Sequence, residues 1–413
     1  MIIPSKINTL SKELDIKLSE INTVLRNQYQ LEEHVGVLEG LSGIALFQFY
    51  YAKYTNTDQY SDWGQETLEK IISKINQGYN YPTYSSGIAG SGWVFDHLNK
   101  QDFVEIDCDD LLNSIDDYLY ITMLKDLEQG YYDFLHGATG YAYYFLNRYQ
   151  STNNTKFKRQ YRNYLIDFVE RLTKIAIKDK NGLKWLSSIN SVHNTKVLGY
   201  NLSLSHGISS IVSFLSKLVI NKEFQKKYSN LLKESVRYLE NAILQEINST
   251  SIYPCWVLKN GEKDKNSRLA WCYGDFGIGL ALLKASKVLK DEKLNKKALS
   301  ILEKTSQRKE QSNTKVIDAG ICHGAFGNAQ IYNYLYKETL MSIYRDAATY
   351  WMKNGLEMST YKDGYAGFKQ WFGKPDKWKP KTSLLEGVAG IGLTIIDYLS
   401  KEQHNWDECL LIS

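Results

Sequence analysis

The chain has 413 residues, of which 43% are hydrophobic and 23% charged, and its formal net charge is +4 at neutral pH. This length suits two or three average domains or one large repeat assembly, and the absence of a basic tract argues against a nucleic-acid-binding protein. Five cysteines suggest no disulfide framework, and we find neither a signal peptide nor an apolar run of about eighteen residues that could form a transmembrane segment. We therefore expect a cytoplasmic protein.

The predicted elements follow one another with a regular alternation. An amphipathic helix is expected near residues 5–27, and later stretches such as 161–176 and 294–302 repeat its three-and-four spacing of apolar residues. Between them lie segments that are apolar on most sides, for example 44–50, 141–145, 278–283 and 391–396, as expected of helices buried on several faces. In total the sequence predicts seven polar-faced and seven apolar helices.

A short glycine motif precedes each apolar helix and recurs seven times. The copies are Gly40-Leu-Ser-Gly43, Gly87-Ile-Ala-Gly90, Gly137-Ala-Thr-Gly140, Gly207-Ile-Ser-Ser210, Gly274-Asp-Phe-Gly277, Gly324-Ala-Phe-Gly327 and Gly387-Val-Ala-Gly390. Successive first glycines are 47 to 70 residues apart, which leaves room for two helices per repeat. We expect the first glycine to provide a positive φ and the second to let two helices approach closely.

Such a repeat can form an open solenoid or a closed ring. A solenoid needs polar terminal repeats, whereas the last repeat here, residues 385–393, is as apolar as the middle ones. We therefore expect an all-α fold, an α/α toroid of seven inner and seven outer helices, in a single domain over residues 1–413. The longest steps contain extra material: residues 178–203 and 249–268 read as β-hairpin flaps, and residues 360–382 as a rim loop.

The positions just before the glycines carry the candidate chemistry. Cys272 and Cys322 both stand two residues before a first glycine, and His323 follows the second of them. If the repeats surround an axis, two thiols and an imidazole converge, which is the composition of a zinc site with an open fourth position. Helix N-termini at these turns would also favour thiolate. Two buried thiols beside a core histidine remain the alternative.

Four segments resemble the signatures of the lanthionine synthetase C (LanC) family of lanthipeptide cyclases. They are Trp271-Cys-Tyr-Gly-Asp-Phe-Gly-Ile278, Ile321-Cys-His-Gly-Ala-Phe-Gly327, Ser205-His-Gly-Ile208 and Leu384-Leu-Glu-Gly-Val-Ala-Gly-Ile-Gly392. The resemblance covers nearly the whole chain, whose length is similar to that of the stand-alone cyclases. It implies an α/α toroid with one zinc ion per chain, held by Cys272, Cys322 and His323. It also implies thioether formation between peptide cysteines and dehydroalanine or dehydrobutyrine.

The resemblance assigns roles to further residues. It implies that His206 is the catalytic acid/base, that Asp133 orients an imidazole, and that Arg268 and Tyr273 bind the enolate oxygen or place the substrate. Structural roles are the alternatives: a helix cap for Asp133, a surface ion pair for Arg268 and core packing for Tyr273. His136 occupies the slot of His206 one repeat earlier, and its role stays open between catalysis and structure.

The family also implies partners. These are a dehydrated precursor peptide with its leader and a complex with a dehydratase and an exporter, which would place the protein at the inner face of the membrane. The main alternative function is a non-catalytic LanC-like scaffold that binds a peptide or glutathione. A toroidal glycoside hydrolase would need paired carboxylates, for which only Glu39 and Glu386 are equivalent candidates. Cys108, Cys255 and Cys409 lie off the pattern and are expected to be ordinary cysteines.

Overall fold

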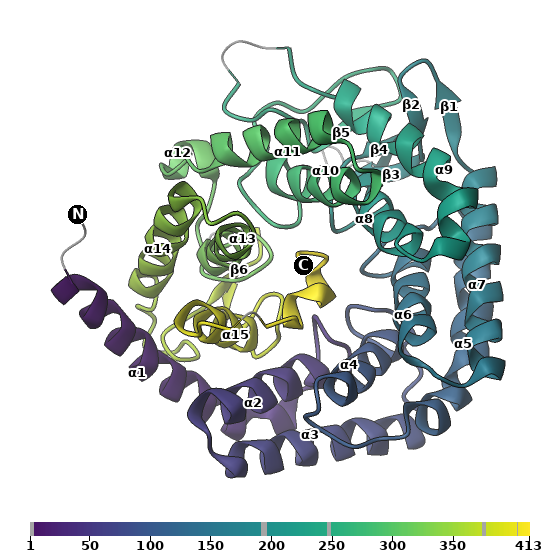
Figure 1. The fold of residues 1–413 in the computed structure, drawn as a ribbon. Coiled ribbons are helices and arrows are strands. Elements are labelled where there is room, and N and C mark those ends of the chain that lie inside the picture. The colour runs from purple at the N-terminus through teal and green to yellow at the C-terminus, as the bar shows by residue number, and fades with distance from the viewer. Residues whose placement is uncertain (1–3, 191–195, 246–248, 374–376, 403) are drawn as a thin grey trace. The chain divides into compact units, whose positions relative to one another are not determined.

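The computed structural model describes residues 4–190, 196–245, 249–373, 377–402 and 404–413, and most of them are helical (Figure 1). The chain divides into two compact units. The terminal unit comprises residues 1–106 and 316–413, and the central unit comprises residues 107–315. The expectation of a single domain remains a prediction. In the described part of the chain no helix is both long and apolar enough to span a membrane.

The terminal unit combines four apolar helices with three longer amphipathic ones. Its elements are α1 (Pro4–Gln28), η1 (Tyr29–Leu31), α2 (Leu41–Thr55), α3 (Asp58–Asn76), α4 (Ile88–Lys100), α13 (Ala325–Thr339), α14 (Ser342–Glu357), β6 (Gln370–Trp371), β7 (Trp378–Lys379), α15 (Val388–Leu399) and η2 (Trp406–Leu410). Helices α2 and α3 form one antiparallel hairpin, and α13 and α14 form another (Figure 1). Helix α15 packs against α13 on one side and α2 on the other, so the apolar helices are neighbours.

The central unit repeats this arrangement and adds the strands. Its elements are α5 (Cys108–Glu128), α6 (Ala138–Ser151), α7 (Thr155–Lys174), β1 (Ile177–Asp179), β2 (Gly182–Lys184), β3 (Ser187–Asn190), β4 (Lys196–Asn201), α8 (Ile208–Val219), α9 (Lys222–Asn241), β5 (Trp256–Leu258), α10 (Asp275–Leu289), α11 (Glu292–Thr305) and α12 (Gln311–Thr314). Apolar helix α8 packs against both α6 and α10. Three hairpins, α6–α7, α8–α9 and α10–α11, therefore stand in a row.

The sequence explains why these helices form where they do. Helix α7 buries Tyr161, Leu165 and Phe168, which lie three or four residues apart on one face, while its lysines and arginines face outward. Its start is fixed by Asn154, whose side chain accepts a hydrogen bond from the Lys156 N–H. Apolar helices such as α2 are buried on every face over most of their length. The expected contrast between polar-faced and apolar helices is therefore observed.

The inserted strands form two small sheets in the central unit. Strands β1 and β2 make a hairpin, and β3, β4 and β5 make an antiparallel sheet in that order. Tyr200 of β4 pairs with Val257 of β5, so the two insertions that were predicted as separate flaps share one sheet. In the terminal unit, β6 and β7 pair through Trp371 and Trp378. Residues 191–195 and 374–376 of the predicted insertions lie outside the described residues.

The glycine motifs are compact turns whose backbones pack on themselves. Gly274 has φ +91°, as expected of the first glycine, but Gly324 at the equivalent position has φ −108°, so the prediction of a general positive φ was wrong. The second glycine is required by close packing within its own turn. A Cβ on Gly327 would lie 1.9 Å from the carbonyl oxygen of Ile321, six residues earlier. The nearest obstacle is thus backbone of the turn, not a neighbouring helix.

Backbone hydrogen bonds join several pairs of successive motifs within the units, through the residue two before the first glycine. The pairs are Cys322 N–H to Leu385 O (3.0 Å), Leu385 N–H to Leu38 O (2.9 Å), Leu38 N–H to Ser85 O (3.0 Å) and Ser205 N–H to Cys272 O (3.4 Å). Equivalent residues of neighbouring repeats therefore meet backbone to backbone. The repeat inferred from the sequence is a structural repeat in both units.

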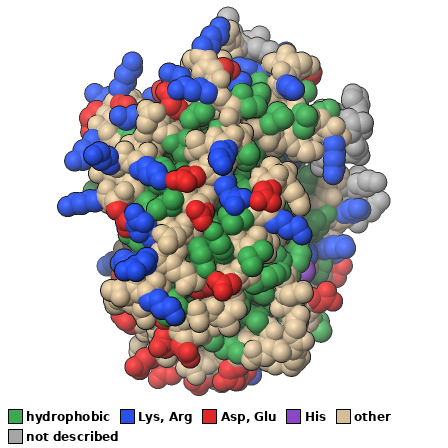
Figure 2. All heavy atoms as spheres, turned by 90° about the vertical axis from the view of Figure 1, so that its right-hand side faces the viewer, with side chains coloured by type: hydrophobic (Ala, Val, Ile, Leu, Met, Phe, Trp, Pro, Cys, Tyr) green, Lys and Arg blue, Asp and Glu red, His purple; other side chains and the backbone are tan. Residues whose placement is uncertain are grey.

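The exposed side of the central unit carries charges of both signs, interspersed with apolar side chains (Figure 2). Several of these charges form ion pairs between neighbouring amphipathic helices. Lys227 of α9 lies 2.6 Å from Glu170 of α7, and Arg171 of α7 lies 2.7 Å from Glu128 of α5. Such exposed pairs contribute little to stability individually, about 0 to 1 kcal/mol.

Candidate active site

A buried carboxylate orients an imidazole in the central unit. His206 precedes helix α8 and Asp133 precedes helix α6, and His206 Nδ1 lies 2.5 Å from Asp133 Oδ2. The other carboxylate oxygen, Oδ1, accepts a hydrogen bond from the backbone N–H of His136 at 2.8 Å. The His206 N–H donates in the same way to Ser203 Oγ at 3.0 Å. The repeated turn thus presents both side chains, and Asp133 spans from one repeat to the next.

This pair has mutually shifted pKa values. Burial disfavours the charge on His206, but the Asp133 carboxylate and its hydrogen bond outweigh burial and raise the pKa of His206 above its ordinary value; the nearby Cys272 thiol adds to the rise. Burial likewise opposes ionisation of Asp133, but His206 prevails and the pKa of Asp133 is lowered. The pair therefore favours an imidazolium next to a carboxylate.

A cavity of about 460 Å³ opens beside the pair. It is lined by Asp133, His136 and His206 together with residues of the inserted sheet, Ser188 and Ile189 of β3 and Trp256 of β5. The side chain of His206 is 29% exposed, so a molecule in the cavity can reach the imidazole. A volume of this size accommodates a few amino-acid residues of a peptide or a small molecule.

Tyr273 also lines the cavity, with its ring centroid 6.0 Å from that of His206. Asn201 Nδ2 donates a hydrogen bond to its hydroxyl at 3.3 Å. Burial raises the pKa of Tyr273, so the hydroxyl keeps its proton. Arg268 is only half-buried and, among the described residues, is not part of the cavity lining.

The ring of His136 lies 6.0 Å from that of His206, tilted by 27°. Burial lowers the pKa of His136, and the neighbouring His206 lowers it further, whereas Asp133 partly compensates. The cavity therefore contains one imidazole that favours the charged form and one that favours the neutral form. The two histidines occupy equivalent places in successive repeats but differ in electrostatics, because only His206 bonds the carboxylate through its ring.

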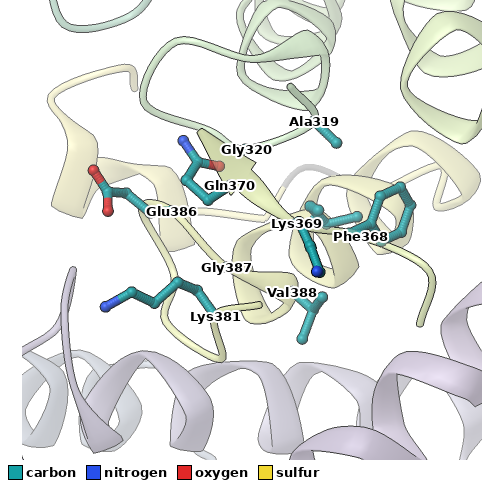
Figure 3. Close-up of a pocket in the computed structure, with 10 residues that line it drawn as sticks. Ala319, Gly320, Phe368, Lys369, Gln370, Lys381, Glu386, Gly387 and Val388 are labelled. Carbon is teal, nitrogen blue, oxygen red and sulfur yellow. The ribbon is translucent and has the colours of Figure 1, made fainter. Parts of the chain in front are cut away.

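A second carboxylate–imidazole pair lies in the terminal unit, next to Cys322. Asp318 Oδ2 lies 3.1 Å from His323 Nε2, and the Asp318 side chain is completely buried. Gln370 of β6 places its amide nitrogen 3.3 Å from the same ring nitrogen. Figure 3 shows Gln370 beside Gly320 in the wall of a small pocket that also contains Lys381 and Glu386.

The paired carboxyl groups considered in the sequence also lie in the terminal unit. Burial raises the pKa of Glu39 to about 8, and the charge of Glu386 contributes to this rise, while Lys381 opposes it. Glu39 is therefore mostly protonated at neutral pH.

Several residues of the site were not predicted from the sequence. Asn201 and Trp256 reach the cavity from the inserted strands, and Asp318 and Gln370 reach His323 from a turn and from β6. Asp318 stands four residues before Cys322, a spacing that gives no signal without the turn geometry. Of the predicted residues, the central unit brings together His206, Asp133 and Tyr273, with Cys272 close enough to influence His206. Cys322 and His323 belong to the terminal unit.

Each unit is a helical repeat in which turns ahead of apolar helices present a carboxylate–imidazole pair. The chain belongs to the lanthionine synthetase C-like family, whose model matches residues 33–411. This confirms the resemblance found in the sequence.

Known relatives agree with this assignment. The chain is 26% identical over 398 residues to the nisin biosynthesis protein NisC of Lactococcus lactis subsp. lactis, covering 90% of this chain and 88% of the relative. It is 24% identical over 341 residues to the glutathione S-transferase LANCL1 of Danio rerio, covering 78% and 75% of the two chains. The solved structure of nisin cyclase matches with a TM-score of 0.73 at 20% identity, covering 97% of this chain and 98% of that one. The match confirms the predicted fold class, an all-α α/α toroid with small β-hairpin insertions.

Proposed function

We propose that this protein is a zinc-dependent lanthipeptide cyclase. Its substrate would be a dehydrated precursor peptide with a leader, in which cysteine thiols add to dehydroalanine or dehydrobutyrine to form lanthionine or methyllanthionine rings. The observation that carries the proposal is the Asp133–His206 pair at the wall of a cavity large enough for a peptide segment. Family membership and the similarity to nisin cyclase support the same reaction.

The residues that would hold one zinc ion are Cys272, Cys322 and His323. Two thiols and an imidazole are a donor set that zinc prefers, and a carboxylate such as Asp318 beside the imidazole is typical of metal-binding histidines. Repeat equivalence supports the set, because Cys272 and Cys322 both stand two residues before the first glycine of their motifs. When bound, zinc supplies a Lewis acid that favours the thiolate form of a substrate cysteine.

His206 would supply the proton that completes the addition. The thiolate sulfur forms a bond to the β-carbon, the carbon–carbon π bond breaks, and its electron pair moves into an enolate. The imidazolium of His206 then donates a proton to the α-carbon. One proton leaves the thiol and one arrives at carbon, so the addition consumes no proton. Asp133 favours the imidazolium by its charge and holds the ring through Nδ1, so that Nε2 can face the cavity.

Tyr273 would stabilise the enolate. Its hydroxyl keeps its proton and accepts a hydrogen bond from Asn201, which leaves the hydroxyl hydrogen to donate to an oxygen in the cavity. The role of Arg268 in binding the enolate or placing the substrate stays a prediction that rests on the family resemblance. A complex with a dehydratase and an exporter, and through it a position at the inner membrane face, also stays a prediction.

The test is cyclisation of a dehydrated precursor peptide by the purified protein. Free thiols are counted by alkylation and mass spectrometry, and bound zinc is measured in the same preparation. We expect one zinc per chain and a loss of free peptide thiols that depends on the protein. His206→Ala should keep zinc yet cyclise poorly, and undiminished turnover in this variant would remove His206 from the mechanism.

A glutathione-binding scaffold is the second candidate, favoured by the similarity to the glutathione S-transferase LANCL1. A site that binds thiols would accept either a peptide cysteine or glutathione. The same experiment separates the two: a dehydrated peptide that binds but never loses its thiols, together with measurable glutathione binding, would favour the scaffold.

A further inference from the structure

We infer that Asp318 is a positioning residue that fixes the His323 ring so that Nδ1, not Nε2, is the nitrogen presented to the metal. This inference rests on the proposed zinc site. It assigns a role to a residue that has no part in the three-ligand set and makes no contact with substrate in the proposed reaction.

The first step of the argument is the contact itself. Asp318 Oδ2 lies 3.1 Å from His323 Nε2, within hydrogen-bond range, and the carboxylate is fully buried while the imidazole is 12% exposed. A buried carboxylate needs hydrogen-bond partners, because a charged group removed from water without them is strongly disfavoured. The His323 ring is one of the partners that Asp318 has.

The second step is that Asp318 is held by backbone groups. The Gly320 N–H donates to Oδ1 at 3.2 Å, and the Trp371 N–H of β6 donates to Oδ2 at 3.2 Å. A Cβ on Gly324 would lie 2.5 Å from Oδ1, so the motif glycine leaves room for the carboxylate. Asp318 is therefore fixed from two directions and can act as a rigid acceptor.

The third step assigns the hydrogen on the ring. A carboxylate only accepts hydrogen bonds, so the nitrogen that faces it must carry the hydrogen. A neutral imidazole has a single N–H, and if it sits on Nε2 the lone pair that can bind a metal is on Nδ1. The Gln370 amide nitrogen is also near Nε2, at 3.3 Å, and would favour the opposite tautomer. The bond to the carboxylate is charge-assisted and therefore stronger than the one to a neutral amide.

The expected consequence is a higher metal affinity. Outer carboxylates of this kind hold the ring in place and increase its basicity, and their removal typically costs about 10- to 100-fold in metal affinity. Figure 3 shows Gln370 beside Gly320, and a Cβ on Gly320 would lie 2.4 Å from Gln370 Oε1, so Gln370 packs closely against this turn.

The test compares zinc affinity in the full-length wild type, Asp318→Ala and Asp318→Asn, by competition with a chromophoric chelator. Asp116→Asn is the matched control, because Asp116 is equally buried but accepts hydrogen bonds from Tyr144 and Tyr161 in the central unit. We expect Asp318→Ala to bind zinc about 10- to 100-fold more weakly, Asp318→Asn to lie between it and wild type, and Asp116→Asn to match wild type.

A second readout is independent of activity and of affinity. The chain has seven histidines, so ¹⁵N-histidine NMR with a His323→Gln difference spectrum can identify the ring of His323. We expect a proton on Nε2 and the metal-induced shift on Nδ1. Metal bound through Nε2, or unchanged zinc affinity in Asp318→Ala, would overturn the inference while leaving the zinc site intact. A wild-type chain that binds no zinc would overturn both, which keeps the two failures distinguishable.

Discussion

His206 Nδ1 and Asp133 Oδ2 lie 2.5 Å apart although 73 residues separate them in the chain. The other oxygen of the same carboxylate bonds the N–H of His136 in the Asp133 turn. The sequence left Asp133 open between a helix cap and a partner of a catalytic imidazole; the N-cap of α6 is Gly137, so Asp133 does not cap the helix and instead bonds the preceding turn and the His206 ring. One oxygen bonds the turn and the other holds the ring, so the bond to the turn also fixes the direction in which the carboxylate points.

Asp133→Asn should move the alkaline limb of the pH–rate profile of cyclisation to lower pH. Burial alone would lower the pKa of His206, and the Asp133 carboxylate is what raises it. Without that charge a smaller fraction of His206 is imidazolium near neutral pH. We expect the rate at pH 7.5 to fall roughly 10- to 100-fold, within the range that general acid–base catalysis contributes. The measurement is the rate of thiol loss from pH 5.5 to 9. An alkaline limb at the wild-type pH would contradict this account.

The same pair should stabilise the folded protein over a defined pH window. The pKa of Asp133 is lowered from 3.8, so its contribution is present above that value and is lost as pH falls through the lowered pKa. The pKa of His206 is raised from 6.5, so its contribution is full below 6.5 and is lost as pH rises through the raised pKa. The pair therefore stabilises most between about pH 4 and 6.5.

We expect His206→Gln to be less stable than wild type in urea at pH 5.5, and the difference to shrink at pH 9. The double variant Asp133→Asn/His206→Gln lacks both charges and is the control. Its stability relative to His206→Gln should be similar at pH 5.5 and at pH 9. A difference that grows with pH would reverse the assigned protonation states.

Cys322→Ala and Cys272→Ala should each lose zinc and cyclisation while keeping the helical circular dichroism of wild type. Neither residue lies in a helix: both precede the glycines that cap α13 and α10. Cys108→Ala is the control, because Cys108 is buried, as Cys272 is, but begins helix α5. The measurement is zinc per chain after dialysis. Retention of one zinc by Cys322→Ala would falsify the ligand set.

The sequence predicted the fold because the seven glycine motifs and the spacing of apolar residues are local signals. The shared sheet of the two insertions was not predictable in this way. Tyr200 and Val257 are paired across 57 residues, and alternation along each strand does not identify the partner strand.

For the candidate site, too, the sequence predicted residues at the repeated motifs but not their partners elsewhere in the chain. Repeat equivalence selected Cys272, Cys322 and His323, and the family resemblance selected His206, Asp133, Arg268 and Tyr273. Asp318 was missed because other repeats carry residues such as Tyr131 and Lys381 at the same position of the turn, and Gln370 because it lies on a short strand outside the motifs. The expected positive φ at each first glycine was wrong at Gly324, where backbone packing, not a left-handed conformation, requires glycine.

Gly327→Ala should destabilise the protein far more than an ordinary glycine replacement. An alanine Cβ would lie 1.9 Å from the Ile321 carbonyl oxygen, and the turn cannot move away freely because the Ile321 N–H is bonded to Leu385 O at 3.0 Å. We expect a loss of at least about 3 kcal/mol, beyond the usual range for a single substitution. Gly261→Ala is the control: its φ is +90° but no atom lies within 4 Å of the added Cβ, so the cost should be about 1 to 2 kcal/mol of backbone strain. Thermal unfolding compares the two, and equal melting temperatures would show that the motif turn can relax, so that its second glycine is not required by packing.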